Sequence, residues 1–370
     1  MQAWTVLTHS AWMRALSLWL LPVMLLVFSG IFAEGTPRNM PIAVVDADNS
    51  HASRELARYL DASPGLHLAH QFESVHEGSQ ALQTGAALAL VVLPHNFEQS
   101  LRLGLSPELV VFYNSQYLLA GKLASSAVRE AATMYAAKAG VMLRVVYGQE
   151  VLSAVSSAAA VRPQMTPLFN PALNYAHFLG TAIVPALWQL FVVMTTLLAL
   201  AWRFQQGPLP SNLRARSVEV IRTVAPVTAV MFAQALLMLW LFHAVMGWHS
   251  EGYLLWLILG LFLMLLATQI MALFIMAIIK NVVRGLSVSA AYLAPAFAFM
   301  GVTFPHADMN IWAQSWGAIM PSTHYINVQI AVADQGAGLS IIWPSLLALL
   351  AFWWVLPLAL WRYPSVLPEE

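Results

Sequence analysis

The sequence has no cysteine and very little charge. The absence of cysteine among its 370 residues excludes disulfides, thiolate metal sites, iron–sulfur clusters and thiol nucleophiles. Charged residues make up only 9% of the chain, whereas soluble domains carry about 25%. The formal net charge is zero, so the chain lacks the basic excess that marks nucleic-acid-binding proteins. Because 59% of the residues are hydrophobic, we expect an integral membrane protein without a nucleic-acid partner.

Motifs for bond chemistry are also missing. No G-x-S-x-G motif is present, and no other spacing places a nucleophile beside its base. The nearest approach to a phosphate-binding loop is Gly121-Lys122, but Gln116 occupies the position where a Walker A motif requires its first glycine. We therefore expect no enzymatic activity and no cofactor on this chain. If it uses ATP, another chain must hold the ATP and its Mg²⁺.

Six apolar runs are long enough to cross a bilayer, whose ~30 Å hydrocarbon core needs about 20 helical residues. They contain no Asp, Glu, Lys or Arg and cover residues 15–33, 176–202, 223–248, 252–279, 285–304 and 339–361. The first run could also be a signal peptide. It is longer than the usual apolar region of such a peptide, and Ile31-Phe32-Ala33-Glu34 is a poor cleavage site, so we expect a retained anchor.

The basic residues beside these runs predict the orientation, because short cytoplasmic loops are enriched in Lys and Arg. One side would hold eight of them: Arg14, Arg203, Arg214, Arg216, Arg222, Lys280, Arg284 and Arg362. The short loops on the other side, 249–251 and 305–338, hold none. We therefore expect both termini, residues 1–14 and 362–370, in the cytoplasm. The segment 34–175 would lie outside; within it, positions 35–172 carry 19 of the 34 formal charges.

This long segment has the pattern of an α/β domain. Apolar runs that predict strands alternate with segments that predict helices, and this alternation favours a sheet with partly parallel pairing. The predicted strands cover 41–46, 66–72, 87–93 and 109–113, and the predicted helices cover 50–61, 74–84 and 96–103. The alanine-rich stretch 117–157 predicts one long helix, or two, returning to the membrane before Pro163, Pro167 and Pro171.

The external segment offers little chemistry. Asp46, Asp48 and Asn49 place oxygen ligands at short spacing, but the glycine and the closing glutamate of a calcium loop are missing. We interpret the string as a turn at the end of a strand. Five scattered histidines form no H-x-x-x-H pair and are expected at the solvated surface; they are His51, His67, His70, His76 and His95.

Three amides lie near the middle of predicted spans: Gln189, Gln234 and Gln269. Amides commonly bond across membrane helices for roughly 1 kcal/mol each, so we favour helix contacts over a role in lining a pathway. No charged residue lies in mid-membrane, which argues against a proton-coupled secondary transporter. His177 and His243, near span ends, keep that alternative open. A receptor or scaffold that binds through the external domain is a second alternative.

Certain strings, in their order, resemble a known family. After the first span come Ile42-Ala-Val-Val-Asp-Ala-Asp-Asn-Ser50, Leu90-Val-Val-Leu-Pro-His-Asn-Phe97 and Leu101-Arg-Leu-Gly104. Before the last span come Met300-Gly-Val-Thr-Phe-Pro305, Trp312 and Met320-Pro-Ser-Thr-His-Tyr325. The chain resembles an ABC-2-type transporter permease of the export class that carries a large extracytoplasmic domain. The resemblance covers nearly the whole chain and implies six transmembrane helices, one before and five after an α/β extracytoplasmic domain.

The resemblance also implies partners and a location. Such a permease lies in the bacterial inner membrane and pairs with a second permease copy or a paralogue. A cytoplasmic ABC ATP-binding subunit would drive it, and a periplasmic adaptor protein would extend the route. The substrate would be amphipathic or hydrophobic, for example a drug-like molecule, a lipid or a glycan. The apolar start of the chain, 3–13, would form an interfacial helix that touches lipid and, in the family, the ATPase.

Two segments would then carry the mechanism. The segment 203–222 would be the coupling loop on the ATPase, through Arg203, Arg214, Arg216, Glu219 and Arg222; the alternative is that these arginines only bind lipid headgroups. The external segment 305–338, with the preceding Phe304, is apolar enough to form short re-entrant helices. It would be an external gate, or a lid that merely packs over the helix ends, and its candidate residues are Phe304, Pro305, Trp312, Trp316, Pro321, His324 and Tyr325.

Overall fold

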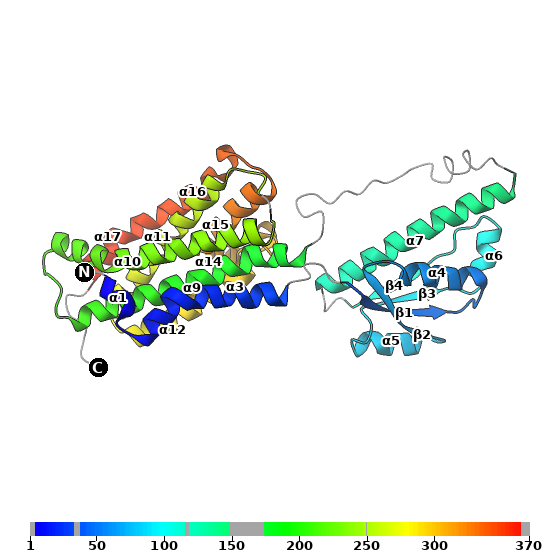
Figure 1. The fold of residues 1–370 in the computed structure, drawn as a ribbon, viewed down its shortest axis with the longest axis horizontal. Helices are drawn as coiled ribbons and strands as arrows, with labels where there is room; N and C mark the ends of the chain where they lie inside the picture. Colours follow the sequence, from blue (N-terminus) through cyan, green and yellow to red (C-terminus); the bar gives the residue numbers. More distant parts are fainter. Residues whose placement is uncertain (1–3, 33–37, 115–117, 149–173, 249, 364–370) are drawn as a thin grey trace. The chain divides into compact units, whose positions relative to one another are not determined.

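The computed structural model describes residues 4–32, 38–114, 118–148, 174–248 and 250–363. They form two compact units (Figure 1). One unit comprises the chain up to residue 35 together with the chain from residue 167 onward, and it is helical. The other comprises residues 36–166 and contains a four-stranded sheet.

The sheet has the strand order β2-β1-β3-β4. Its strands are β1 (Met40–Asp46), β2 (Leu66–Phe72), β3 (Ala89–Leu93) and β4 (Val110–Tyr113). β1 pairs in parallel with both β2 and β3, and β4 runs antiparallel to β3. The partly parallel α/β layer predicted from the sequence is therefore present, with all four strands close to the predicted positions.

Helices cover both faces of this sheet: α4 (His51–Asp61), α5 (Val75–Gln83), α6 (Phe97–Arg102) and α7 (Leu118–Val146). Ile42 and Val44 of β1 enter a core formed with α4 and α7, whereas Ala43 and Val45 face α5 on the other side. Burial on both faces explains why β1 is a continuous apolar run. Of the helix predicted over 117–157, the residues beyond 148 and the prolines 163, 167 and 171 lie outside the described residues.

The helical unit begins with three short elements that precede its first long helix. They are α1 (Thr5–Thr8), α2 (Ala11–Arg14) and a π-helical turn, η2 (Ala15–Trp19), which runs into α3 (Leu20–Ile31). Val6, Leu7 and Met13 are buried in the main core of the bundle. The segment from Thr5 to Arg14 is therefore part of the bundle and packs against α9 and α10.

Long helices follow the sheet unit in the sequence. They are α9 (Tyr175–Gln205), α10 (Leu213–Trp240) continued by the π-helical η3 (Leu241–Val245), α11 (Leu254–Ile279) and α12 (Val282–Leu293). The remaining elements are α13 (Ala296–Phe299), η4 (His306–Asp308), α14 (Ile311–Ala318), α15 (Pro321–Gln329), η5 (Ile330–Asp334), α16 (Leu339–Ala351), η6 (Phe352–Trp354) and α17 (Val355–Arg362). α11 is central and packs against α9, α10, α12, α15, α16 and α17.

Within the described residues, six helical stretches are long and apolar enough to cross a membrane, as predicted. They cover Ala11–Ile31, Ala176–Gln205, Leu213–Val245, Leu254–Ile279, Val282–Phe299 and Leu339–Arg362. The fifth is interrupted at Pro295, whose ring lacks the N–H that a continuous helix needs. The sixth contains a 3₁₀ turn, η6, just before Pro357 for the same reason.

The start of the third span differs from its predicted position by ten residues. The helix of the third span begins at Leu213 and not near Thr223, because Asn212 caps it: the Asn212 Oδ1 atom accepts a hydrogen bond from the Arg214 backbone N–H at 2.9 Å. Of the segment 203–222, only 206–212 is a loop, and the rest extends α9 and α10. Polar and basic side chains do not stop a helix that leaves the apolar region, so the apolar run alone underestimated its length.

Candidate functional site

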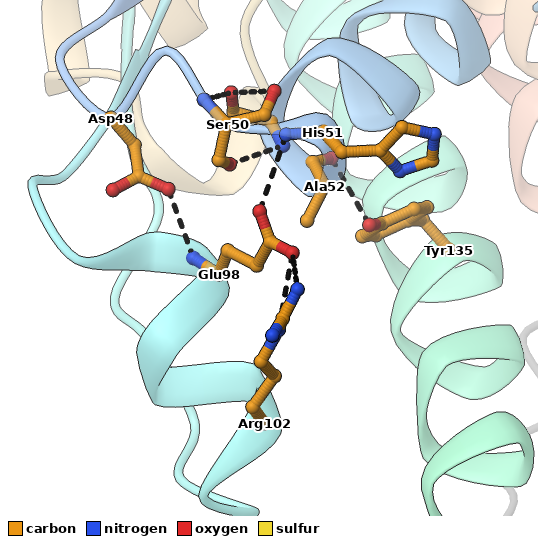
Figure 2. A network of polar contacts seen from close by, with 8 residues as sticks. Asp48, Ser50, His51, Ala52, Glu98, Arg102 and Tyr135 are labelled. Atoms are coloured by element: carbon orange, nitrogen blue, oxygen red, sulfur yellow. Dashed lines mark hydrogen bonds and ion pairs between the residues drawn. The ribbon is translucent and has the colours of Figure 1, made fainter.

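The carboxyl ends of β1 and β3 meet at the edge where open α/β sheets usually bind ligands. Here the chain fills that place itself (Figure 2). The Asp48 Oδ2 atom accepts a hydrogen bond from the backbone N–H of Glu98 at 3.0 Å, and the Glu98 Oε2 atom accepts one from the backbone N–H of His51 at 3.2 Å. The first turn of α6 thus receives a carboxylate from the loop before α4, and the first turn of α4 receives one from α6.

The Asp-x-Asp-Asn string is therefore a turn and a cap. The Asp46 Oδ1 atom accepts hydrogen bonds from the backbone N–H groups of Asp48 and Asn49 at 3.1 and 2.9 Å, which is an Asx-type turn. Burial raises the pKa of Asp48, but hydrogen bonds led by the Glu98 N–H outweigh it, so the pKa lies below its usual range. Among the described residues, no group of three or more His, Asp or Glu side chains is arranged to hold a metal ion.

The basic candidates near the start of α10 divide into two kinds. The Arg203 Nε atom lies 2.8 Å from the Glu219 Oε1 atom, in an ion pair that joins α9 to α10. Arg216 donates to the backbone oxygens of Pro210, Ser211 and Tyr363 at 3.2, 2.8 and 2.6 Å. These arginines hold the end of the bundle together.

Arg214 and Arg222 are different, because both are exposed. They lie on one stripe of α10 with the exposed Val218 and Ile221. Arg214 and Arg222 are each four residues from Val218, and Ile221 is three residues from it, so all four share one face. This stripe, residues 214, 218, 221 and 222, combines positive charge with apolar surface. It lies at the same end of the bundle as Arg203 and Arg216.

Each of the three predicted mid-span amides bonds to a different element. The Gln234 Nε2 atom donates to the Ser17 backbone oxygen in the π-helical turn η2 at 2.7 Å. The Gln269 Oε1 atom accepts from the Thr228 hydroxyl at 2.9 Å, and the Gln189 Oε1 atom accepts from the Ser322 backbone N–H at 2.7 Å. These bonds join α10 to the first span, α11 to α10, and α9 to α15.

The segment 311–334 forms a helical hairpin, with α14 as one arm and α15 with η5 as the other. The second arm runs antiparallel to the first half of α9, because Ser322 contacts Gln189 and the Asp334 Oδ1 atom lies 3.2 Å from the His177 Nε2 atom. Gln189 is 13 residues from Ala176, or about 20 Å along the helix axis at 1.5 Å per residue. The hairpin tip therefore reaches the middle of a span.

The residues predicted for a gate lie in this hairpin and in the segment before it, and they differ in burial. Tyr325 is fully buried against Gly260 of α11, where a Cβ atom would lie 3.2 Å from the tyrosine ring. Pro321 is buried as well, and the His324 Nε2 atom bonds to the Ala318 backbone oxygen at 2.8 Å. Trp312 and Trp316 on α14 are exposed, as are Phe304 and Pro305 before η4. The hairpin thus has one packed arm and one exposed arm.

Comparison with known proteins identifies the family. The sequence profile described as ABC-2 family transporter protein matches residues 11–362. The chain belongs to the ABC-2 transporter family.

Individual relatives of this ABC-2 family chain are distant but similar along most of their length. The inner membrane transport permease YhhJ of Escherichia coli (strain K12) is 24% identical over 332 residues, which cover 87% of this chain and 84% of the relative. The probable multidrug ABC transporter permease YbhR of the same organism is 25% identical over 343 residues, covering 90% and 88%. No solved structure matches the chain.

The structure of this ABC-2 permease also shows contacts that sequence reasoning missed. His177 stacks on Trp248 with ring centroids 5.1 Å apart and pairs with Asp334. Tyr363, just beyond the last apolar run, is buried and stacks on Phe204 at 5.3 Å. His177 and Tyr363 both lie at span ends. A polar or aromatic residue beside an apolar run is the sequence signal that could have indicated such contacts.

Proposed function

We propose that this chain is the membrane subunit of an ATP-driven exporter that works as a dimer with a separate ATP-binding subunit. The observation that carries the proposal is a match to the ABC-2 family over residues 11–362 in a chain whose sequence has no Walker A motif. The substrate would be an amphipathic or hydrophobic molecule. The relative YbhR bears the name of a probable multidrug ABC transporter permease, which supports a substrate of this class.

In this proposal the first span precedes an extracytoplasmic sheet domain, five spans follow it, and both termini are cytoplasmic. The eight basic residues beside the short loops of one side, against none on the other, support that orientation. The sheet domain would then be available to an adaptor protein. At the carboxyl ends of β1 and β3, the carboxylates of Asp48 and Glu98 are already bonded to the chain's own backbone. We therefore expect an adaptor to bind at other surfaces of the domain.

The coupling surface would be the stripe formed by residues 214, 218, 221 and 222. Arg214 and Arg222 offer charge, and Val218 and Ile221 offer apolar contact area to a protein partner. Arg203, Glu219 and Arg216 would hold α10 in place beneath this surface, since their charged groups bond within the bundle. Lipid headgroups remain the alternative partner for the two exposed arginines.

The hairpin 311–334 would close the outer end of the route. Its packed arm is tied to α9 at both ends, at Gln189 and at His177. The backbone N–H of Glu251, in the loop between η3 and α11, also donates to the Ala333 oxygen at 3.0 Å. ATP-driven approach of two ATPase subunits would move such packed elements and expel the substrate.

The decisive experiment is affinity purification of the tagged chain from its native membrane in mild detergent. We expect a stably associated protein with a Walker A motif, and ATP hydrolysis by the complex after reconstitution. A second candidate is a proton-coupled transporter, which the half-buried His177–Asp334 pair favours. Transport that continues without any ATPase and collapses with the proton gradient would establish that candidate and contradict the exporter.

A further inference from the structure

The tip of the hairpin has more hydrogen-bond donors than it uses. Ser322 and Thr323 lie in the first turn of α15, and the oxygens of both hydroxyls are buried without a partner among the described residues. The same holds for the Gln189 Nε2 atom, in the amide whose oxygen already binds the Ser322 N–H. Ser322 and Gln189 are fully buried, and Thr323 is 2% exposed.

The acceptors at this tip are, in contrast, already bonded. The Ala318 backbone oxygen binds the His324 ring, and the Ile319 oxygen binds the Tyr292 hydroxyl. The Met320 oxygen accepts from the Thr323 backbone N–H at 3.2 Å. An acceptor from elsewhere would therefore find three unused donors, in the two hydroxyls and the Gln189 amide. The hydroxyl oxygens could also accept, but these three backbone carbonyls are already bonded.

The backbone adds positive potential at the same point. α15 and η5 form one helical arm from Pro321 to Asp334, and its N-terminal end carries the positive end of the helix dipole. The acidic residue of the hairpin, Asp334, lies at the opposite end of that arm and is paired with His177. In secondary transporters, half-helices that start near the bilayer midplane point their N-termini at anionic substrate groups, and the same electrostatics would apply here.

The tip lies next to a surface of the protein. Ala318 and Ile319, in the turn between the two arms, are exposed, and Ile319 is 47% accessible. This turn immediately precedes the buried donors of α15. Only the buried Met320 and Pro321 separate these exposed residues from Ser322 in the sequence.

We propose that the first turn of α15 receives the anionic head group of an amphiphilic substrate, with the Ser322 and Thr323 hydroxyls and the Gln189 amide as its donors. The apolar tail would lie along the exposed arm of the hairpin, where Trp312, Trp316 and Ile319 are accessible. This inference rests on the proposed export function and assigns its substrate a head-group charge. The expected class is a carboxylate or phosphate amphiphile.

The test is a fluorescence titration of the complex of permease and ATPase in phosphatidylcholine nanodiscs, without ATP, at pH 8. The probe is dansylaminoundecanoic acid, and its uncharged methyl ester is the matched comparison. We expect the acid to bind at least tenfold more tightly than the ester. Hydrogen bonds to charged groups are worth enough that removing two donors should weaken acid binding by about tenfold or more.

The variants separate binding from folding. Ser322→Ala with Thr323→Val removes both hydroxyls. Thr196→Val is the matched control, because that hydroxyl is equally buried but bonded to the Val192 oxygen at 2.7 Å. Ser322→Thr and Thr323→Ser keep the donors and should keep the preference for the acid. Melting temperature and size-exclusion profile are measured for every variant.

Each outcome decides the inference. Equal binding of acid and ester, or unchanged acid binding in the double variant, overturns the inference. It would mean that buried water, and not a head group, accepts from these donors. Such a result with the ATPase still bound leaves the export proposal intact. Addition of phosphatidylglycerol to the discs identifies the source: competition with the acid assigns the site to a lipid head group, and its absence assigns the site to a transported amphiphile.

Discussion

The guanidinium group of Arg216 donates a hydrogen bond to the backbone oxygen of Tyr363 at 2.6 Å, across 147 positions of sequence. The same group binds the carbonyls of Pro210 and Ser211. One side chain therefore joins the start of α10, the loop before it and the end of the last helix. Arg214, two residues earlier, is exposed. Two arginines that look equivalent in the sequence thus occupy different environments.

Replacing these two arginines separately should give different defects. Arg216→Ala should lower the free energy of unfolding by about 2 kcal/mol, because three carbonyls lose a charged donor. Arg214→Ala should leave stability within about 0.5 kcal/mol of the parent, as exposed substitutions usually do, and should weaken retention of the ATPase. Denaturation in detergent and co-purification measure the two effects. Equal stability losses would contradict the distinction, and full ATPase retention in Arg214→Ala would remove this residue from the coupling surface.

The bond between Gln234 and the Ser17 oxygen should be measurable as stability. Gln234→Leu removes the donor to the π-helical turn of the first span, and we expect a loss of about 1 kcal/mol. Gln269→Leu is the comparison and should cost less, since Thr228 retains an alternative acceptor in the Val224 oxygen at 3.1 Å. Unfolding by denaturant in detergent ranks the two variants, and the reverse order would show that packing and not hydrogen bonding decides.

The sheet unit should lose stability in acid. The Lys138 ammonium group, 2.8 Å from the Glu55 carboxylate, lowers the pKa of Glu55, and the hydrogen bond from Arg102 lowers the pKa of Glu98. The pKa of Asp48 is lowered too. Because these folded-state pKa values lie below the ordinary values of 3.8 and 4.5, the stability they contribute is complete above those values. It is lost as the pH falls through the lower, folded-state values.

Calorimetry of the purified chain tests this expectation. The thermal transition of the sheet unit should have a constant midpoint between about pH 7 and pH 5 and a falling one below about pH 4.5. Glu55→Gln should flatten that fall, because the substituted amide cannot titrate. A midpoint that does not change down to about pH 3 would show that these carboxylates contribute nothing to folding.

The pair formed by Asp334 and His177 should keep the packed arm of the hairpin in place. Asp334→Asn removes the negative charge but preserves the shape, so we expect faster hydrogen exchange in residues 321–334. The first turn of α9 should respond too, since the Asn174 side chain caps it at the His177 N–H at 3.0 Å. Asp308→Asn, in the separate turn η4, is the control. Unchanged exchange in the Asp334 variant would mean that packing around Tyr325 suffices.

Much of the fold could be predicted because its signals are local. Apolar runs predicted the spans, and alternation of strands with helices predicted the sheet unit. The string from Asp46 to Ser50 predicted a turn, since its side chains bond to neighbouring backbone. Prolines 295 and 357 disturbed two spans in ways that their chemistry explains, but the sequence does not show which prolines a bundle will accommodate.

The candidate site was less predictable because its contacts are distant in sequence. Gln189 was identified as a polar residue in mid-span, but nothing near it in the chain indicated Ser322 as its partner, 133 positions away. The roles of Arg214 and Arg216 differ only because Tyr363 folds back beside one of them. Local patterns identify which residues are unusual, whereas tertiary packing decides what each of them touches.

The two ties between the hairpin and α9 have a mechanical consequence. A lid held at one end can swing about that end, but the packed arm is fastened to the same helix near its start and near its finish. The arm and the first half of α9 are therefore expected to travel as one rigid body. Any opening must then shear along the other boundaries of that body, where Tyr325 faces Gly260 and where Ala333 meets Glu251. Those two boundaries are where the resistance to movement would be set.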